Sequence, residues 1–282
     1  MGTCLTRYSP IPRINTIGTR TEKKYIKTKD GNLKLVILKP KKVSRLLPGI
    51  LWIHGGGYES GGSYMVHFSI GKKLAKKFGG IVISPEYRKS KKSPYPAAFD
   101  DCCRALEYMY NNAEKLGINK NKLIVGGESA GGGLTVAVCM YARDIANIPI
   151  QLQIPLYPML DCDDTESSKN NKGYNWNTKK NHRGWSKYLG DLYKTDKVPK
   201  YASPSKEIDY HNLPPCFTYV LDGEPFYQET IDYIENLKKS NVVAKLDIYH
   251  GNIHGFDMLF WTKKAKRAKN VLYNDVREYF DE

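Results

Sequence analysis

A serine and several glycines within residues 123–133 have the types and spacing that suit acyl-transfer chemistry. Ser129 stands between Gly127 and Gly131, after an aliphatic run and before a stretch that favours a helix. A Gly-x-Ser-x-Gly pattern between a strand and a helix is typical of a strained turn that exposes a nucleophilic serine. Glycines are needed there because a Cβ would collide with neighbouring backbone. We predict that Ser129 is a nucleophile; the alternative is a glycine-rich turn in which Ser129 caps the helix.

A second glycine-rich stretch begins at His54 and follows the apolar residues 50–53. Its glycines at 55–57 leave backbone N–H groups uncovered. Such groups stabilise the oxyanion that forms when a serine attacks a carbonyl carbon, by about 3 kcal/mol each. The N–H of Ala130, the residue after the nucleophile, is the expected partner donor. We expect His54 to shape this loop by hydrogen bonding rather than to act as the base; a flexible glycine turn beside a core histidine is the alternative.

The general base must be sought among the histidines that follow Ser129, because nucleophiles of this kind are followed along the chain by the acid and then by the histidine. Four histidines qualify: His182, His211, His250 and His254. The first two precede the last predicted strands, and His250 ends a strand. His254 lies in a loop after the final strand and before the final helix, where a base reaches over the sheet edge. We therefore predict His254 as the base.

The acid should emerge from the carboxyl end of the preceding strand. Asp222 directly follows the apolar residues 217–221, and Glu224 is a close alternative. Asp209 and Asp247 are less well placed. Asp222 also precedes a glycine, and Asp-Gly is a common turn pair without catalytic meaning. We predict Asp222 as the acid that orients His254, with Glu224 as the second choice.

Short aliphatic segments alternate with helical stretches along most of the chain. Strands are predicted at residues 33–38, 49–53, 81–84, 123–126, 151–155, 217–221 and 244–249, and helices at 64–78, 97–116, 130–143, 227–240 and 262–279. This alternation predicts a single α/β domain over residues 1–282, with a mostly parallel sheet and helices on both faces. Residues 161–212 interrupt the pattern. They are polar but rich in Trp and Tyr, and we predict a small cap or lid over the carboxyl edge of the sheet.

Together these stretches resemble the α/β-hydrolases, in particular the hormone-sensitive-lipase-like family with its bacterial and fungal acetyl and short-chain carboxylesterases. The resemblance runs from about residue 48 to residue 260 and includes the motifs at 54–58, 86–88, 95–98, 127–132, 155–158, 222–226 and 254–256. It implies an α/β-hydrolase fold, a triad of Ser129, Asp222 and His254, and an oxyanion hole formed by Gly56, Gly57 and Ala130. Glu128 departs from the aspartate that the family commonly has at this position.

Composition limits the other classes of function. The formal charge is +15, but the lysines come in pairs scattered along the chain, which predicts a solvated surface and no nucleic-acid partner. No stretch has the roughly 18 apolar residues of a membrane span, and residues 1–20 do not resemble a secretory signal. We therefore expect a cytoplasmic protein. The six cysteines lack zinc-site spacing, so we expect free thiols and no metal or organic cofactor.

These observations predict a serine carboxylesterase that hydrolyses small esters through an acyl-enzyme. The aromatic composition of residues 161–212 favours a closed pocket over a long aliphatic channel, so we expect acetyl to butyryl esters as substrates. The alternatives are a peptidase or amidase of the same fold and a binding protein that has kept the fold without turnover. The sequence leaves open whether the protein is a monomer or a homodimer.

Overall fold

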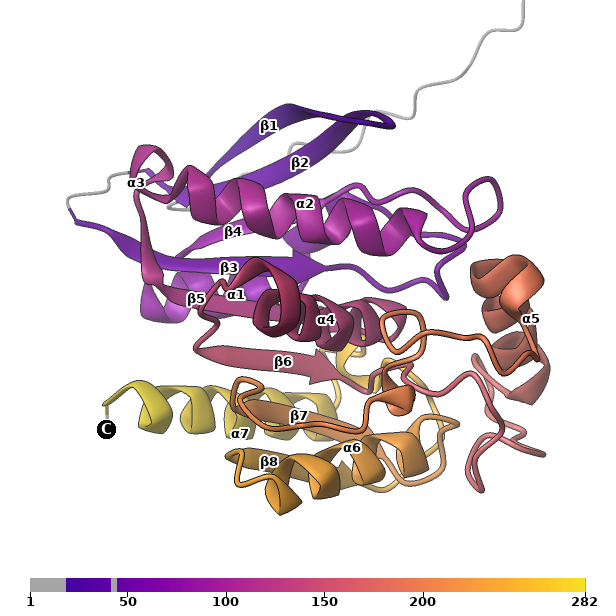
Figure 1. Cartoon of the computed structure of the whole chain (residues 1–282). Coiled ribbons are helices and arrows are strands. Elements are labelled where there is room, and N and C mark those ends of the chain that lie inside the picture. The colour runs from indigo at the N-terminus through magenta and orange to yellow at the C-terminus, as the bar shows by residue number, and fades with distance from the viewer. Residues whose placement is uncertain (1–18, 42–44, 282) are drawn as a thin grey trace, which may run out of the picture.

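The computed structural model describes residues 19–41 and 45–281, and its centre is one eight-stranded sheet (Figure 1). The strand order is β1-β2-β4-β3-β5-β6-β7-β8. The pairs β1–β2 and β2–β4 are antiparallel, and all other pairs are parallel. The bounds are β1 (Thr19–Thr28), β2 (Gly31–Pro40), β3 (Leu47–Ile53), β4 (Ile81–Pro85), β5 (Ile118–Glu128), β6 (Leu152–Leu156), β7 (Cys216–Leu221) and β8 (Ala244–Tyr249). The predicted mostly parallel α/β-hydrolase architecture is confirmed.

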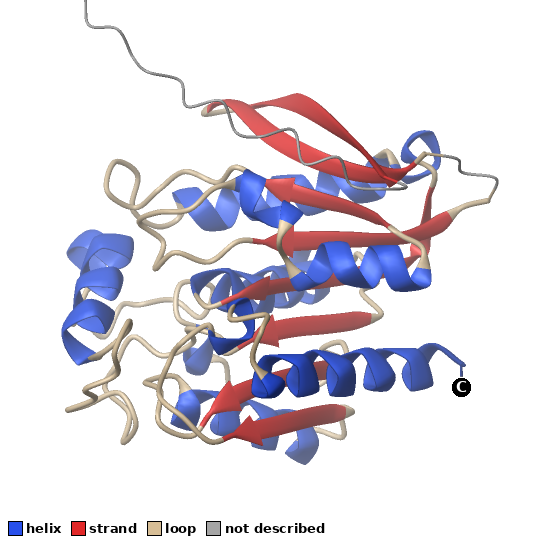
Figure 2. Cartoon of the chain, turned by 180° about the vertical axis from the view of Figure 1, so that it is seen from behind, coloured by secondary structure: helices blue, strands red, loops and turns tan. Residues whose placement is uncertain are grey.

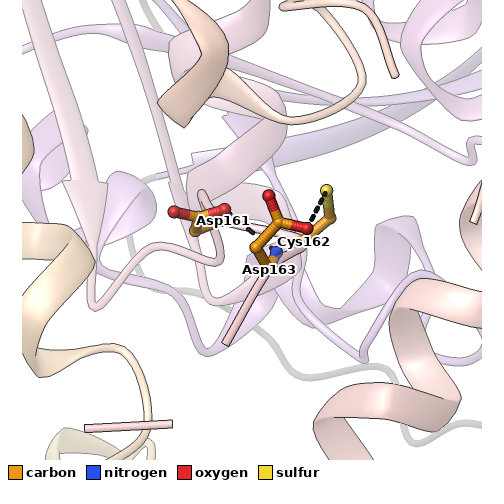
Figure 3. A group of neighbouring side chains, drawn as sticks. All are labelled: Asp161, Cys162 and Asp163. Atoms are coloured by element: carbon orange, nitrogen blue, oxygen red, sulfur yellow. Dashed lines mark hydrogen bonds between the residues drawn. The ribbon is translucent and has the colours of Figure 1, made fainter. Parts of the chain in front are cut away.

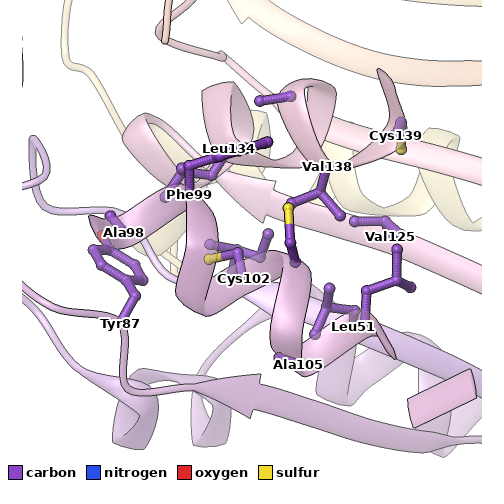
Figure 4. Close-up of a cluster of buried hydrophobic side chains, with 14 of the residues drawn as sticks. Leu51, Tyr87, Ala98, Phe99, Cys102, Ala105, Val125, Leu134, Val138 and Cys139 are labelled. Atoms are coloured by element: carbon purple, nitrogen blue, oxygen red, sulfur yellow. The ribbon is translucent and has the colours of Figure 1, made fainter. Parts of the chain in front are cut away.

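Helices cover both faces of the sheet. Helices α1 (Ile70–Phe78) and α7 (Lys263–Asp281) pack on one face, and both lie in front of the strands in Figure 2. The other face carries α2 (Ala97–Asn111), α3 (Ala113–Leu116), α4 (Ala130–Tyr141) and α6 (Tyr227–Lys239). Figure 4 shows the core on this second face, where Leu51 and Val125 of the sheet meet Cys102 of α2 and Val138 of α4.

The elements differ from the predicted ones in several places; the predicted helix at 97–116, for example, is divided into α2 and α3. Strand β1 was not predicted, because its many charges hide the strand pattern; it lies at an edge of the sheet, where charged side chains remain in water. The predicted helix at 64–78 is a 3₁₀ turn, Ser63–His67, followed by α1, whose start is capped by the Ser69 hydroxyl accepting the Lys72 N–H. Residues 161–212 contain a further helix, α5 (Thr178–Leu189).

Helix α5 lies beyond the carboxyl ends of the strands, as Figure 1 shows. It is joined to the loop after β3 by aromatic packing: the rings of Tyr58 and Tyr188 stack with centroids 3.8 Å apart, and Trp185 packs against both. Arg183 adds an ion pair to Glu59 at 2.8 Å. Because all three rings are fully buried, α5 is held against this loop by a substantial apolar contact.

Two further predictions concern cysteines and membrane spans. Five cysteines are free and buried, at positions 102, 103, 139, 162 and 216, whereas Cys4 lies outside the described residues. Over the described ranges, no helix combines the length and the apolar character that crossing a membrane requires.

Candidate active site

Ser129 occupies a strained turn between β5 and α4. Its φ of 58° and ψ of −120° are unfavourable for a residue with a side chain, and such strain is held only where the surroundings fix it. The Ser129 N–H donates to the carbonyl of Leu156, and its own carbonyl accepts from Gly133 and Met159. A Cβ at Gly127 or Gly131 would overlap the carbonyl of Ile53. The glycines flanking Ser129 therefore let β3, β5 and α4 approach closely enough to hold the turn.

The Ser129 hydroxyl is linked to a histidine and a carboxylate. Its Oγ lies 2.8 Å from Nε2 of His254, and Nδ1 of His254 is hydrogen-bonded to Oε2 of Glu224. Because a carboxylate only accepts, Nδ1 carries the proton and Nε2 is left to accept the serine proton. Glu224 is fully buried, and its Oε1 accepts the Leu221 N–H at 2.9 Å. The imidazole edge also meets the rings of Tyr157 and Phe226, each with centroids 5.0 Å away.

Asp222 does not contact His254, so the prediction of that contact is wrong. Its Oδ2 lies 2.9 Å from Nδ1 of His250, and its Oδ1 accepts the Gly251 N–H at 3.0 Å. The physical reason is the direction of the chain: the Asp222 N–H still donates to Tyr249, so Asp222 continues the ladder with β8 and faces the sheet edge. The Gly251 N–H and then His250 lower the pKa of Asp222. This pair is solvent-exposed, because His250 has 95% of its side-chain surface accessible.

The surroundings of Glu224 in the fold explain why it is the carboxylate that meets His254. Glu224 is followed by Pro225 and Phe226, and Phe226 is a buried residue directly before α6. A carboxylate placed between a buried strand and a buried aromatic is desolvated, and it requires a fixed partner. Asp222, by contrast, precedes Gly223 in the turn pattern that is usual at the surface.

The glycine loop after β3 lies beside Ser129. A Cβ at Gly55 would come within 3.3 Å of the Ser129 Cβ, and Gly56 and Gly57 have φ values of 123° and 59°. Within the described chain, the N–H groups of Gly56 and Gly57 donate to no other backbone carbonyl. The N–H of Ala130 is free of an intrahelical acceptor because Ala130 is the first residue of α4. The loop after β3 and the start of α4 therefore have N–H groups that their own backbone leaves unused.

His54 fixes the start of this loop. Its Nδ1 lies 2.7 Å from the Gly55 carbonyl, its Nε2 lies 3.1 Å from Nζ of Lys89, and its ring stacks on Tyr87 with centroids 4.1 Å apart. A carbonyl only accepts, so Nδ1 is the protonated nitrogen and Nε2 accepts from the Lys89 ammonium. Burial, and then the charge of Lys89, lower the pKa of His54 to about 3. His54 thus stays neutral and acts as a loop support, as its sequence position suggests.

Glu128, the residue before the nucleophile, points away from the oxyanion loop. Its Oε1 accepts the indole N–H of Trp52 at 2.8 Å. Burial raises the pKa of Glu128 to about 8, with a further contribution from the nearby carboxylate of Asp257. Asp257 is itself buried and accepts the Tyr157 hydroxyl at 2.7 Å. Glu128, Asp257 and Tyr157 therefore form a second group of polar side chains. This group meets the triad where the Tyr157 ring contacts His254.

Residues 175 and 176 approach the site from the segment between β6 and β7. The Asn175 amide donates to the His254 carbonyl at 2.6 Å. The six-membered ring of Trp176 occupies the space where a Cβ of Gly57 would lie, and its centroid is 6.2 Å from that of His254. Its indole N–H faces the Asn181 side chain at 3.4 Å. Trp176 is thus one wall of the space around the triad, whereas Tyr58 and Trp185 are buried in the contact between α5 and the loop after β3.

One group of metal-ligand-type atoms occurs within the described ranges, at Asp161, Cys162 and Asp163 (Figure 3). These side chains already have protein partners. Asp161 accepts the Asp163 N–H at 3.0 Å, and Asp163 forms an ion pair with Lys206. The group is therefore accounted for by its loop and its lysine, and it supplies no atom to the triad.

The arrangement around Ser129 matches the requirements of nucleophilic acyl transfer. A hydroxyl hydrogen-bonded to a neutral imidazole loses its proton as it attacks, a buried carboxylate stabilises the imidazolium that results, and nearby N–H groups receive the oxyanion. His182 and His211 contribute nothing here, since each is an exposed side chain paired with a nearby aspartate, Asp164 and Asp209 respectively.

The sequence matches a known protein family and several named relatives. Residues 50–258 match the family model described as alpha/beta hydrolase fold. An AB hydrolase superfamily protein of Schizosaccharomyces pombe is 30% identical over 73% of this chain, a match that spans 62% of that protein's length. A carboxylesterase of Mycobacterium tuberculosis is 28% identical over 77% of this chain and 69% of its own, and an arylesterase of Saccharolobus solfataricus is 30% identical over 82% and 75%.

The fold is also similar to solved structures of esterases. A bacterial heroin esterase superimposes with a TM-score of 0.88 at 28% identity, covering 93% of this chain and 84% of its own. An esterase of the archaeon Pyrobaculum calidifontis superimposes with a TM-score of 0.83 at 28% identity, covering 92% and 83%.

Proposed function

Because the chain belongs to the α/β-hydrolase family, in its hormone-sensitive-lipase-like branch, we propose that it is a serine carboxylesterase that hydrolyses small short-acyl esters. Carboxylic ester hydrolysis has the support of both the relatives' names and the site. The observation that carries the proposal is the hydrogen-bonded series from Ser129 through His254 to Glu224. The proposed preference for acetyl to butyryl esters rests on the residues that form the walls of the site.

In the proposed cycle, the Ser129 oxygen attacks the ester carbonyl carbon while its proton passes to Nε2 of His254. Gly56, Gly57 and Ala130 donate to the oxyanion. The C–O bond to the alcohol then breaks, and the alcohol leaves with the proton held by His254. Water, deprotonated by His254, attacks the acyl-enzyme and releases the acid and free Ser129. We assign the carboxylate that stabilises the imidazolium to Glu224 rather than to Asp222.

The expectation of short acyl groups is supported by the position of Trp176. The substrate carbonyl must lie within about 3 Å of both the Ser129 oxygen and the oxyanion donors. Trp176 packs directly on Gly57 and faces His254, so a part of the substrate on that side meets a rigid ring. A long chain would need a continuous apolar groove to recover about 0.8 kcal/mol per CH₂. We propose that residues 161–212 act as a cap that limits acyl length.

Turnover of p-nitrophenyl esters from acetyl to decanoyl tests the proposal. We expect kcat/KM to peak between acetyl and butyryl and to fall steeply by octanoyl. Ser129→Ala and His254→Ala should both abolish turnover, since nucleophile and base act as one unit. A fluorophosphonate probe should label the natural chain and not Ser129→Ala. Efficiency that continues to rise through decanoyl would contradict the cap assignment, and faster cleavage of the matched amide would contradict the esterase assignment.

A further inference from the structure

A basic surface with an apolar rim lies on the face formed by α1 and α7. Residues 70–78 and 263–274 contain nine Lys or Arg and no Asp or Glu; eight of the nine reach the surface, because Lys269 is buried. The two helices pack together on the same face of the sheet (Figure 2). Nζ of Lys77 lies 4.9 Å from the ring centroid of Tyr273. The fold therefore brings together three of the lysine pairs, at 72–73, 76–77 and 263–264.

Large apolar side chains are exposed at one end of this face. Helices α1 and α7 both begin at the edge where the parallel strands end, because each follows a strand and runs back along the sheet. Phe68 directly precedes α1 and is 64% exposed. Met258, Phe260 and Trp261 precede α7 and are 64%, 66% and 63% exposed. We call these four residues the apolar rim. Ile253, directly before His254 in the chain, is also exposed.

Cations gather at the positive ends of α1 and α7. The first turns of α1 and α7 contain no acidic residue, although a helix N-terminus carries a partial positive charge. Lys263 and Lys264 begin α7 next to Lys266 and Arg267, so like charges stand together at the positive end of the helix. Lys263, Lys264 and Arg267 also line a groove of about 460 Å³ between α7 and β8, with Asp247 as its acidic residue. An anionic partner would relieve this repulsion.

We infer that the α1–α7 face binds the surface of an anionic lipid bilayer and turns the candidate active site toward it. Proteins that bind at a membrane interface commonly expose Trp, Phe and Met beside clustered Lys and Arg. The rings and the thioether enter the headgroup region, and the cations bind lipid phosphates. A second copy of the chain fits less well, because a symmetric contact would set the two basic faces against each other. Duplex DNA would satisfy the cations and leave the apolar rim without a partner.

Vesicle binding by the full chain carrying Ser129→Ala tests this inference without hydrolysis. The probes are vesicles of phosphatidylcholine alone and of phosphatidylcholine with an equal amount of phosphatidylglycerol. We expect co-sedimentation with the anionic vesicles only, weakening as salt is raised. Trp261 should show a blue-shifted emission on binding and quenching by brominated lipid. Both signals should fall sharply in Trp261→Phe, because Trp52 and Trp185 are fully buried. Trp176, which is partly buried beside His254, supplies the remaining signal.

Two variants and a matched control separate the rim from the charge. Phe260→Ser with Trp261→Ser removes the rim, and Lys73→Glu with Lys76→Glu reverses two exposed charges on α1; each should weaken vesicle binding about tenfold or more. Lys238→Glu with Lys239→Glu makes the same charge change on α6, on the opposite face of the sheet, and should leave vesicle binding near its original level. Circular dichroism and the melting temperature verify that each variant is folded.

The inference is overturned if the chain fails to bind anionic vesicles at low salt, or if the α6 control loses as much binding as the α1 variant. It is also overturned if the rim variant dissociates a dimer of the chain and leaves vesicle binding unchanged. The same holds if duplex DNA displaces the chain from anionic vesicles and binds the rim variant as well as the original chain. Its relevance to substrate rests on the proposed esterase function, but binding is measured on an inactive variant. A failure of the esterase assay and a failure of vesicle binding are therefore separate results.

Discussion

The ammonium of Lys89 donates to Nε2 of His54 at 3.1 Å, and the opposite nitrogen of the same ring donates to the Gly55 carbonyl at 2.7 Å. Lys89 is itself held by the Tyr87 carbonyl, at 2.6 Å, and by Glu86, at 3.6 Å. The burial of His54, and then the charge on Lys89, lower the pKa of His54 and keep the imidazole neutral. The two hydrogen bonds select one tautomer. A cation outside the triad thus fixes the first peptide of the loop that presents Gly56 and Gly57.

Lys89→Met should therefore impair the chemical step more than substrate binding. Methionine retains much of the apolar stem and removes the ammonium, so Nε2 of His54 is left buried without a donor, at a cost of about 1 to 3 kcal/mol. We expect kcat on a short ester to fall about tenfold while KM changes less than about twofold. Lys91→Met, which removes an exposed charge from the same loop, is the control. Equal losses in the two variants would show that His54 does not depend on Lys89.

Glu224→Gln should be far more damaging than Asp222→Asn. Glutamine keeps the shape of the side chain but loses the charge that stabilises the imidazolium, so kcat should fall by about 10² to 10⁴. Asp222 pairs with the exposed His250, so its amide variant should stay within about twofold of the original kcat. Steady-state kinetics of the two variants on one ester decide the assignment. The opposite ranking would return the acid role to Asp222.

Trp176→Ala should move the acyl-length profile toward longer chains. Removing the ring opens the space between Gly57 and His254, so we expect kcat/KM for octanoyl relative to acetyl esters to rise about tenfold. Tyr174→Ala is the matched control, because Tyr174 is an aromatic of the same segment that is 85% exposed. An unchanged profile in Trp176→Ala would place the limiting wall elsewhere.

Glu128→Gln should make stability less dependent on pH. The folded chain raises the pKa of this carboxyl from its ordinary 4.5 to about 8. A raised pKa means that the folded state binds this proton more tightly. The contribution of Glu128 to stability is therefore fully present below about pH 4.5 and is lost as pH rises through about 8. Glutamine cannot ionise and can still accept the Trp52 N–H. We expect the melting temperature of the variant to exceed that of the original chain at pH 8.5 and to match it near pH 5.

The sequence alone determined the parts of this protein that depend on local pattern. Ser129 and its flanking glycines, the loop that starts at His54, and the placement of His254 after the last strand are recognisable because each needs particular residue types at fixed spacing. The central strands are likewise readable, since buried parallel strands are nearly continuous aliphatic runs. Strand β1 was not predicted, because an exposed edge strand does not need a continuous run of aliphatic residues.

Tertiary structure decided which of two nearby carboxylates meets His254. Asp222 and Glu224 leave the same turn, and their separation in the chain does not say which one points inward. The direction was set by the hydrogen bond from Asp222 to β8, which keeps Asp222 at the sheet edge, and by the burial of Glu224 before Phe226. The packing of Trp176 on Gly57 and the gathering of lysines on α1 and α7 arise in the same way. Each joins residues far apart in the chain, and only the folded backbone brings them together.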